Sequence, residues 1–275
     1  MIVDLPRLPS VGLDVLQASL VALPAAHALP RWLPQPRSTL WALTLPVSIV
    51  ACVLGIEALP GTADVLAWLS LIALPLLAAF GLGIAGVHGA RPWLAVVAVG
   101  LLVLAIVAPD GVVSDLSAGL LTTLGAATLA WALVRVAPHL AVKVGLVAMA
   151  VIDAYLVFGN TLQAPNAVLN AAVVAPDLPQ LQRIALDGAS MGFGDLFVAA
   201  CFGAILAAEG RPQGRWTVVA FVAFLLFDLL FTWFDVLPAT VPVAVLVVVA
   251  EVLRRRAAHV GRVGAPGRAA VASGG

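Results

Sequence analysis

Residues 189–206 read Ala-Ser-Met-Gly-Phe-Gly-Asp-Leu-Phe-Val-Ala-Ala-Cys-Phe-Gly-Ala-Ile-Leu. This stretch predicts a membrane-spanning helix with one ionisable side chain, Asp195, close to its start and directly after two glycines. A charged side chain inside hydrocarbon costs at least about 2.5–3.5 kcal/mol on insertion scales, so acids within spans usually serve a function. Asp195 is therefore the first candidate for a functional residue.

The composition of the whole chain indicates a membrane protein. Of its 275 residues, 63% are hydrophobic and only 10% are charged, and the mean hydropathy is +1.11. A soluble domain carries roughly 25% charged residues. Apolar runs long enough to cross a bilayer recur from end to end, which predicts an all-α fold, a polytopic transmembrane helical bundle. The formal net charge of zero provides no basic surface for a nucleic acid.

The apolar runs divide the chain into four parts. Residues 1–38 form an N-terminal segment, whose apolar part 11–29 is either a weak first span or an interfacial helix. Residues 39–138 hold the first clear spans, residues 139–256 hold the spans around Asp195, and residues 257–275 are predicted to be a disordered tail. The bundle thus has eight spans, or nine with the N-terminal segment. The clear spans are Thr39–Ile56, Val65–Val87, Pro92–Val107, Leu116–Val136, His139–Gly159, Ser190–Ala208, Trp216–Phe234 and Val236–Leu253.

The charges between these spans predict the orientation of the bundle. Basic and acidic connections alternate along the chain, and basic connections lie on the cytoplasmic side. The pattern predicts a multi-pass protein of the cell membrane with a cytoplasmic C-terminus. In chain order the charged residues are Arg31 and Arg37, Glu57 and Asp64, Arg91, Asp110 and Asp115, Arg135 and Lys143, Asp177, Arg183 and Asp187, Arg211 and Arg215, Asp235, and Arg254 to Arg256.

A second acid, Asp153, is predicted to lie at the same depth as Asp195. Asp153 stands about six residues, or roughly 9 Å, before the outer end of its span. The next span runs back inward, and Asp195 is about five residues into it. Two facing carboxyl groups in a medium of low dielectric cannot both ionise at little cost, so they can share one proton. One carboxylate then activates water while its protonated partner polarises a peptide carbonyl, without a metal or cofactor.

The residues around both acids resemble the motifs of a known family. Gly192-Phe193-Gly194-Asp195 matches the GxGD signature of the intramembrane aspartyl proteases, the presenilin and signal peptide peptidase group. The stretch from Asp153 to Gly159 is similar to that group's first aspartate motif, except that Ile152 stands where a tyrosine is usual. Leu237-Pro238-Ala239 looks like its Pro-Ala-Leu motif, with Thr240 in place of the leucine.

This resemblance implies specific roles and a specific substrate. Asp153 and Asp195 would be the catalytic pair, and the substrate groove would be bordered by Gly192, Phe193, Gly194, Leu237, Pro238 and Ala239. The substrates would be transmembrane peptides or proteins within the lipid bilayer. The orientation is similar to that of signal peptide peptidase, which implies spans with a cytoplasmic N-terminus as substrates. Glycines suit this role, because without side chains they let an extended backbone approach closely.

Three alternatives remain open on the sequence. A proton- or ion-coupled transporter could use the same buried acids, although no internal repeat is visible. The protein could be a prepilin-type peptidase, because those enzymes also carry GxGD. It could also be an inactive relative of the intramembrane proteases with a binding role, because Ile152 and Thr240 depart from the family motifs. Asp228, a third acid within a span, is interpreted as a packing or water-cavity residue. No HExxH motif indicates a zinc protease.

Overall fold

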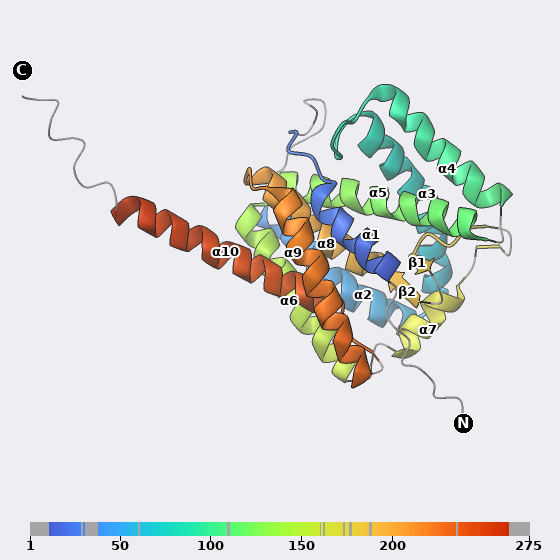
Figure 1. Ribbon diagram of the computed structural model, residues 1–275. Helices are drawn as coiled ribbons and strands as arrows, with labels where there is room; N and C mark the ends of the chain where they lie inside the picture. The colour runs from blue at the N-terminus through green and yellow to red at the C-terminus, as the bar shows by residue number, and fades with distance from the viewer. Residues whose placement is uncertain are drawn as a thin grey trace, which may run out of the picture.

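The computed structural model describes residues 11–28, 30, 38–59, 61–108, 111–159, 161, 163–172, 174–175, 178–186, 189–234 and 236–263. The described part of the chain is mostly helical (Figure 1). Its α-helices are α1 (Val11–Ala22), α2 (Thr44–Ala58), α3 (Thr62–Gly83), α4 (Ala95–Val107), α5 (Val112–Val136), α6 (His139–Phe158), α7 (Gln163–Ala171), α8 (Phe193–Ala208), α9 (Gln213–Asp228) and α10 (Thr240–Val263). Shorter elements are the 3-10 turns η1 (Thr39–Leu43), η2 (Pro92–Leu94) and η3 (Leu229–Thr232) and the strands β1 (Arg183–Leu186) and β2 (Ala189–Gly192).

Five helical segments within the described residues are long and apolar enough to cross a membrane. They are Thr39–Ala58, Thr62–Gly83, Val112–Val136, His139–Phe158 and Gln213–Thr232. Many of their apolar side chains face outward, as expected where the solvent is lipid; Val65 and Leu76 on α3 are both 65% exposed. These spans indicate a multi-pass membrane protein. Three further apolar helices are shorter: Val11–Ala22, Pro92–Val107 and Phe193–Ala208.

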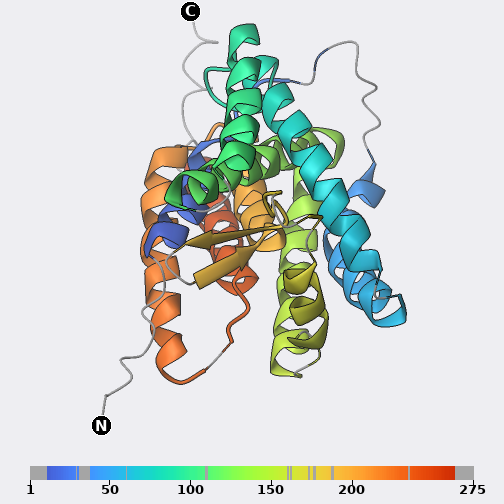
Figure 2. The ribbon, with the colours of Figure 1, turned by 90° about the vertical axis from the view of Figure 1, so that its right-hand side faces the viewer.

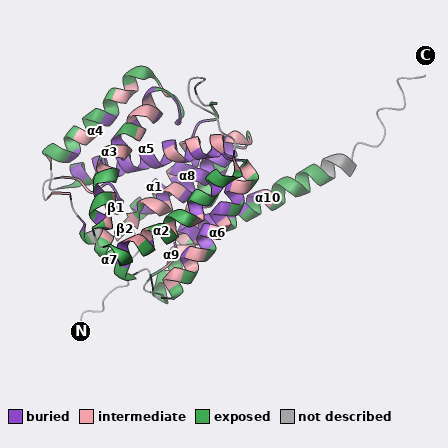
Figure 3. Ribbon diagram, turned by 180° about the vertical axis from the view of Figure 1, so that it is seen from behind, coloured by how far each residue is buried: buried purple, intermediate pink, exposed green. Residues whose placement is uncertain are grey.

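Helices α5 and α8 form the centre of the bundle. Both are buried over most of their length (Figure 3), and every residue from Val198 to Ala207 in α8 is buried. Helix α8 contacts α1, α5, α6, α9 and α10, so neighbouring helices surround it. A helix that is apolar on all sides is stable in such a position, because no side of it meets water. The start of this central helix is where Asp195 lies.

Helix α1 is packed inside the bundle, and the sequence did not predict this position. Its 12 residues span about 18 Å, too short for an unaided membrane crossing. Leu20 and Val21 are fully buried against α8 and α9. The close approach depends on Gly203 of α8, since a Cβ atom there would lie 2.5 Å from the Val21 carbonyl oxygen. At the same point Gln213 Nε2 donates hydrogen bonds to the carbonyls of Val21, Pro24 and Gly203.

A short β-hairpin leads into α8, where the sequence predicted a loop up to Ser190 and helix from there. Strands β1 and β2 pair antiparallel, with Arg183 opposite Gly192, and lie beside α1 and α5 (Figure 2). The predicted span began at Ser190, but the backbone is extended until Gly192, whose ψ is 155°. Hydropathy does not separate a short apolar strand from the first turn of a helix, so the start of α8 at Phe193 could not be predicted from it.

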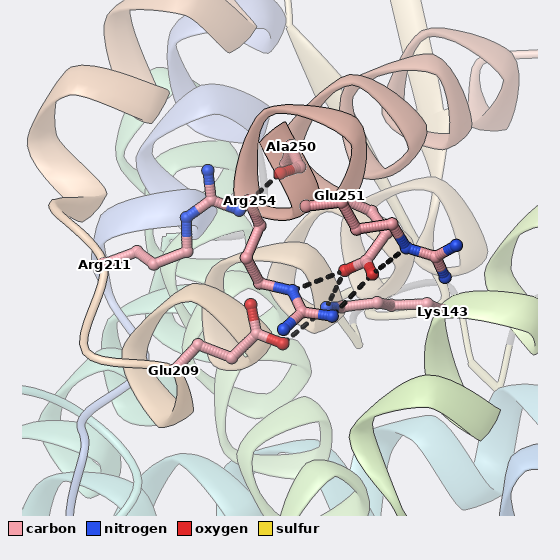
Figure 4. A network of polar contacts seen from close by, with 7 residues as sticks. Lys143, Glu209, Arg211, Ala250, Glu251 and Arg254 are labelled. Carbon is pink, nitrogen blue, oxygen red and sulfur yellow. Dashed lines mark hydrogen bonds and ion pairs between the residues drawn. The ribbon is translucent and has the colours of Figure 1, made fainter. Parts of the chain in front are cut away.

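An ion-pair network joins the start of α6, the end of α8 and the middle of α10 (Figure 4). Lys143 of α6 bonds Glu209 at the end of α8 and, at 2.9 Å, Glu251 of α10. Glu251 also pairs with Arg254 and Arg255. Helix α10 continues to Val263 and projects from the bundle (Figure 1), so the predicted tail begins as helix. The remainder of that tail, residues 264–275, lies outside the described residues.

Candidate active site

Asp153 is buried on α6 and receives hydrogen bonds from the start of α10. Its side chain is 7% exposed, and Thr240 Oγ1 donates to Asp153 Oδ2 at 2.6 Å. The backbone of Thr240 donates a second hydrogen bond to the same carboxyl group. Thr240 is the first residue of α10 and is itself 2% exposed. The structure therefore brings Thr240, which is 87 residues away in the chain and directly follows Leu237-Pro238-Ala239, into contact with Asp153.

Asp195 lies in the first turn of α8, two residues after the helix begins at Phe193. The backbone N–H of Gly192, the N-cap residue, forms a hydrogen bond with its carboxyl group. An acid at this position satisfies a backbone donor that the helix leaves free, and it faces the positive end of the helix dipole. The local sequence thus fixes the carboxyl group at the junction between β2 and α8.

The two acids lie at the same end of neighbouring antiparallel helices. Asp153 and Asp195 are close enough for their charges to interact directly. The helices touch nearby, since a Cβ atom on Gly194 would lie 3.9 Å from Met149 Cε of α6. The Lys143–Glu209 pair joins the opposite ends of the same two helices, roughly 15 Å from Asp153 along α6 and 21 Å from Asp195 along α8. The two helices are therefore held in register at both ends.

The residues predicted to bind substrate gather around these acids. Gly192 is exposed, whereas Phe193 and Gly194 are half-buried. Phe193 stacks on Phe197 one turn later, with ring centroids 6.0 Å apart. Pro238 is buried, and Leu237 and Ala239 are half-buried. Ala239 lines a small cavity together with Met191, the residue before Gly192, so the two motif segments approach each other at one place.

Two polar residues of this site were not assigned a role from the sequence. Thr240 was read only as a departure from a family motif, although its hydroxyl group is the donor to Asp153. Gln17 of α1 is 2% exposed, and its Nε2 donates to the backbone carbonyl of Asp195 at 3.5 Å. A lone glutamine in an apolar run was the available signal, because buried amides need partners. Its partner, 178 residues away, could not be identified without the fold.

The described residues contain no group of three or more His, Cys, Asp or Glu side chains arranged to hold a metal ion. No protein-family model, curated protein or solved structure matches the chain. A function is therefore inferred from the chemistry of the site together with its motif resemblance.

Proposed function

We propose that this protein is an intramembrane aspartyl endopeptidase that cleaves transmembrane segments, with Asp153 and Asp195 as its catalytic pair. The observation that carries the proposal is the position of these two acids. They lie on antiparallel helices within range of charge–charge interaction, and no basic side chain among the described residues forms an ion pair with either. The flanking motifs, which resemble those of the presenilin and signal peptide peptidase group, support the same conclusion.

The chemistry requires one proton on the pair. The ionised carboxylate takes a proton from water as the water oxygen attacks the peptide carbonyl carbon, and the protonated carboxyl donates to the carbonyl oxygen. The C–N bond then breaks as one acid gives its proton to the leaving amine and the other carboxylate takes a hydroxyl proton from the intermediate, so the pair again holds one proton. The Thr240 hydroxyl donates to Asp153 Oδ2, which fixes the orientation of that carboxyl group. General acid–base groups of this kind contribute about 10²–10⁴-fold to a rate.

The hairpin offers a way to hold an extended substrate. Among the described strands, β2 pairs only with β1, so no strand lies along its other edge. Ser190 and Gly192 of β2 are exposed. An extended peptide can add to such an edge as a further strand. Because β2 continues directly into Gly192-Phe193-Gly194-Asp195, a peptide added there would run toward the acids with its backbone unwound.

The proposal includes a membrane topology. Helices α4, α8 and α10 would add to the five long apolar segments to give eight spans, while α1, at about 18 Å, is too short to add a ninth unaided. The alternation of loop charges supports a cytoplasmic C-terminus in the cell membrane. The pair would then lie nearer the outer face, as in signal peptide peptidase, and substrates would be spans with a cytoplasmic N-terminus.

The test is a cleavage assay in lipid vesicles with tagged single-span substrates. The variants Asp153→Asn and Asp195→Asn preserve the size of each side chain while removing its acid. Each should lower the cleavage rate by about 10²–10⁴-fold. Asp64→Asn, which changes an exposed acid at the start of α3, is the matched control and should retain full activity. Cleavage that survives either substitution would remove that residue from the catalytic pair.

A proton-coupled transporter is the second candidate, and one observation favours it. The bundle contains another pair of contacting acids, Asp14 and Asp228, on different helices from the first pair. Chains of acids within a membrane often carry protons in pumps and transporters. Vesicles containing the protein and an enclosed pH indicator distinguish the two functions. Proton flux that depends on Asp195, without any cleavage of a substrate panel, would favour transport over proteolysis.

A further inference from the structure

Two acids outside the proposed catalytic pair meet inside the bundle. Asp14 of α1 and Asp228 at the end of α9 line the same small cavity, and their carboxyl groups lie within interaction range of each other. Asp14 is only 3% exposed, and Asp228 is half-buried. The two residues stand more than 200 positions apart in the chain, and the contact exists because α1 packs along α9. Neither residue belongs to a motif.

Both acids line a cavity of about 30 Å³, together with Gln17, Met191, Ala239 and Pro242 and two phenylalanines of α9. A cavity of this size holds a water molecule when polar groups line it. Asp14 Oδ2 is buried, and no donor from the described residues reaches it. A buried carboxylate oxygen without a donor is costly, so its environment should supply a proton or a cation.

The charged groups on the elements that pack against α1 do not neutralise this pair. None of the residues that line the cavity is basic. On β1, Arg183 lines a different cavity, beside Asp115 at the start of α5, and bonds Gln180. On α5, Arg135 bonds the Ala25 carbonyl beyond the far end of α1. Arg215 begins α9 about three turns before Asp228, and Asp195 on α8 adds negative charge rather than positive.

We propose that Asp14 and Asp228 form a binding site for a single proton, which is shared between the two carboxyl groups and holds α1 against α9. Two carboxyl groups that line one small cavity without a basic residue cannot both ionise at little cost, so one of them should hold a proton. A divalent metal ion would need further acidic or imidazole ligands, and no such group occurs in the described part of the chain. The proton is the ligand that fits two contacting carboxyl groups.

The site has a consequence for the neighbouring acids. Gln17 lies one turn after Asp14 on the same helix, and it donates to the backbone carbonyl of Asp195. The cavity also touches Met191, which precedes Gly192-Phe193-Gly194-Asp195, and Ala239 of the Leu237-Pro238-Ala239 motif. When the shared proton leaves, repulsion between Asp14 and Asp228 should loosen α1 and its contact with Asp195. Proton binding itself does not depend on the proposed peptidase function.

Infrared spectroscopy of the full-length protein in lipid vesicles tests this site, because a protonated carboxylic acid has its own C=O absorption. Raising the pH should remove the absorption of one carboxylic acid from the wild type. Asp14→Asn and Asp228→Asn should each lack this titrating absorption, whereas Asp195→Asn and the exposed control Asp64→Asn should keep it. The Asp195→Asn spectrum separates this site from the proposed catalytic pair. An absorption that persists in both Asp14→Asn and Asp228→Asn would overturn the proposal.

Two further measurements keep the proposal open to refutation if a variant fails to fold. Wild-type protein labelled with ¹³C-aspartate must show the absorption shifted by the label, and its absence would overturn the proposal. Sodium added at constant pH must leave the absorption unchanged; if sodium abolishes it, the site binds a metal cation instead. The Asp14→Asn amide can donate to Asp228, so this variant should fold and its thermal stability should depend less on pH than that of the wild type.

Discussion

Helices α6, α8 and α10 meet at two places where acids are shielded from solvent, and the two places differ in charge. At one place the buried Lys143 lies between the half-buried Glu209 and Glu251, so the acids there have a cation. At the other place Asp153 and Asp195 lie near each other, and their described partners are neutral groups, Thr240 and the Gly192 backbone. The bundle can therefore neutralise an acid where structure requires it. The absence of a cation beside Asp153 and Asp195 is what the proposed shared-proton chemistry of this pair requires.

Removal of the Lys143 cation from its pairs with Glu209 and Glu251 should have the largest effect on stability. Lys143→Met leaves Glu209 and Glu251 in place with less positive charge, and breaking a buried ion pair costs about 3–5 kcal/mol. Arg255→Met is the matched control, because Arg255 is 68% exposed and its pair with Glu251 should contribute about 0–1 kcal/mol. Thermal or denaturant unfolding in detergent measures both. Equal losses in the two variants would contradict the assignment of Lys143 as the structural cation.

A Cβ atom on Gly203 should displace α1 from the centre of the bundle. In Gly203→Ala this atom would lie 2.5 Å from the Val21 carbonyl oxygen, and overpacking of this kind costs about 1–3 kcal/mol. Gly100→Ala on α4 is the control, since nothing lies within 4 Å of its Cβ position. That variant should gain roughly 0.4–1 kcal/mol, because the unfolded chain loses freedom. A stable Gly203→Ala protein with α1 still in contact with α8 would contradict this packing.

Loss of the Thr240 hydroxyl group should lower the activity of the Asp153–Asp195 pair while the protein stays folded. Thr240→Val removes one donor to Asp153, and a hydrogen bond to a charged group contributes about 1.5–3 kcal/mol. We expect a drop in kcat of at least about tenfold, little change in KM and a shifted pH profile for cleavage. Thr240→Ser keeps the hydroxyl group and should restore most of the rate. Unaltered kcat and pH profile in Thr240→Val would show that Thr240 does not position Asp153.

The smallest effect on stability is expected at Gly194. A Cβ atom there would sit 3.9 Å from Met149 Cε, which is ordinary contact, so Gly194→Ala should change the unfolding free energy by no more than about 0.5 kcal/mol. Its cleavage rate should nevertheless fall, because an extended substrate needs close approach to this backbone. Comparison of unfolding and cleavage in one variant separates folding from function. Full activity in Gly194→Ala would remove the glycine from the substrate groove.

The sequence predicted the helices of the bundle better than their contacts. Apolar runs located most helices, because a lipid-facing or buried helix requires a long run of apolar side chains and hydropathy measures this property. The hairpin before Phe193 was missed because four extended residues carry no distinctive pattern. The position of α1 was missed because it depends on Gly203 and Gln213, which lie far away in the chain.

The sequence predicted the pairing of Asp153 with Asp195, but it did not predict the pairing of Asp14 with Asp228. Asp153 and Asp195 lie on consecutive predicted spans, so topology and motifs together suggested that they are partners. Asp14 was noted only as a charge in a weak span, and Asp228 only as a packing or cavity residue. Their contact follows from the packing of the first described helix on α9, which no local pattern specifies. Contacts between helices distant in the chain require the fold.

The most direct test of the central claim is whether Asp153 and Asp195 act as one unit. Cleavage rates should be compared in Asp153→Asn, Asp195→Asn and the double variant, each reconstituted in lipid vesicles and shown to be folded. Residues that act together in one step are strongly non-additive. We predict that the double variant loses no more activity than either single variant. Measurable cleavage in both single variants, with the two losses multiplying in the double variant, would contradict a shared catalytic pair.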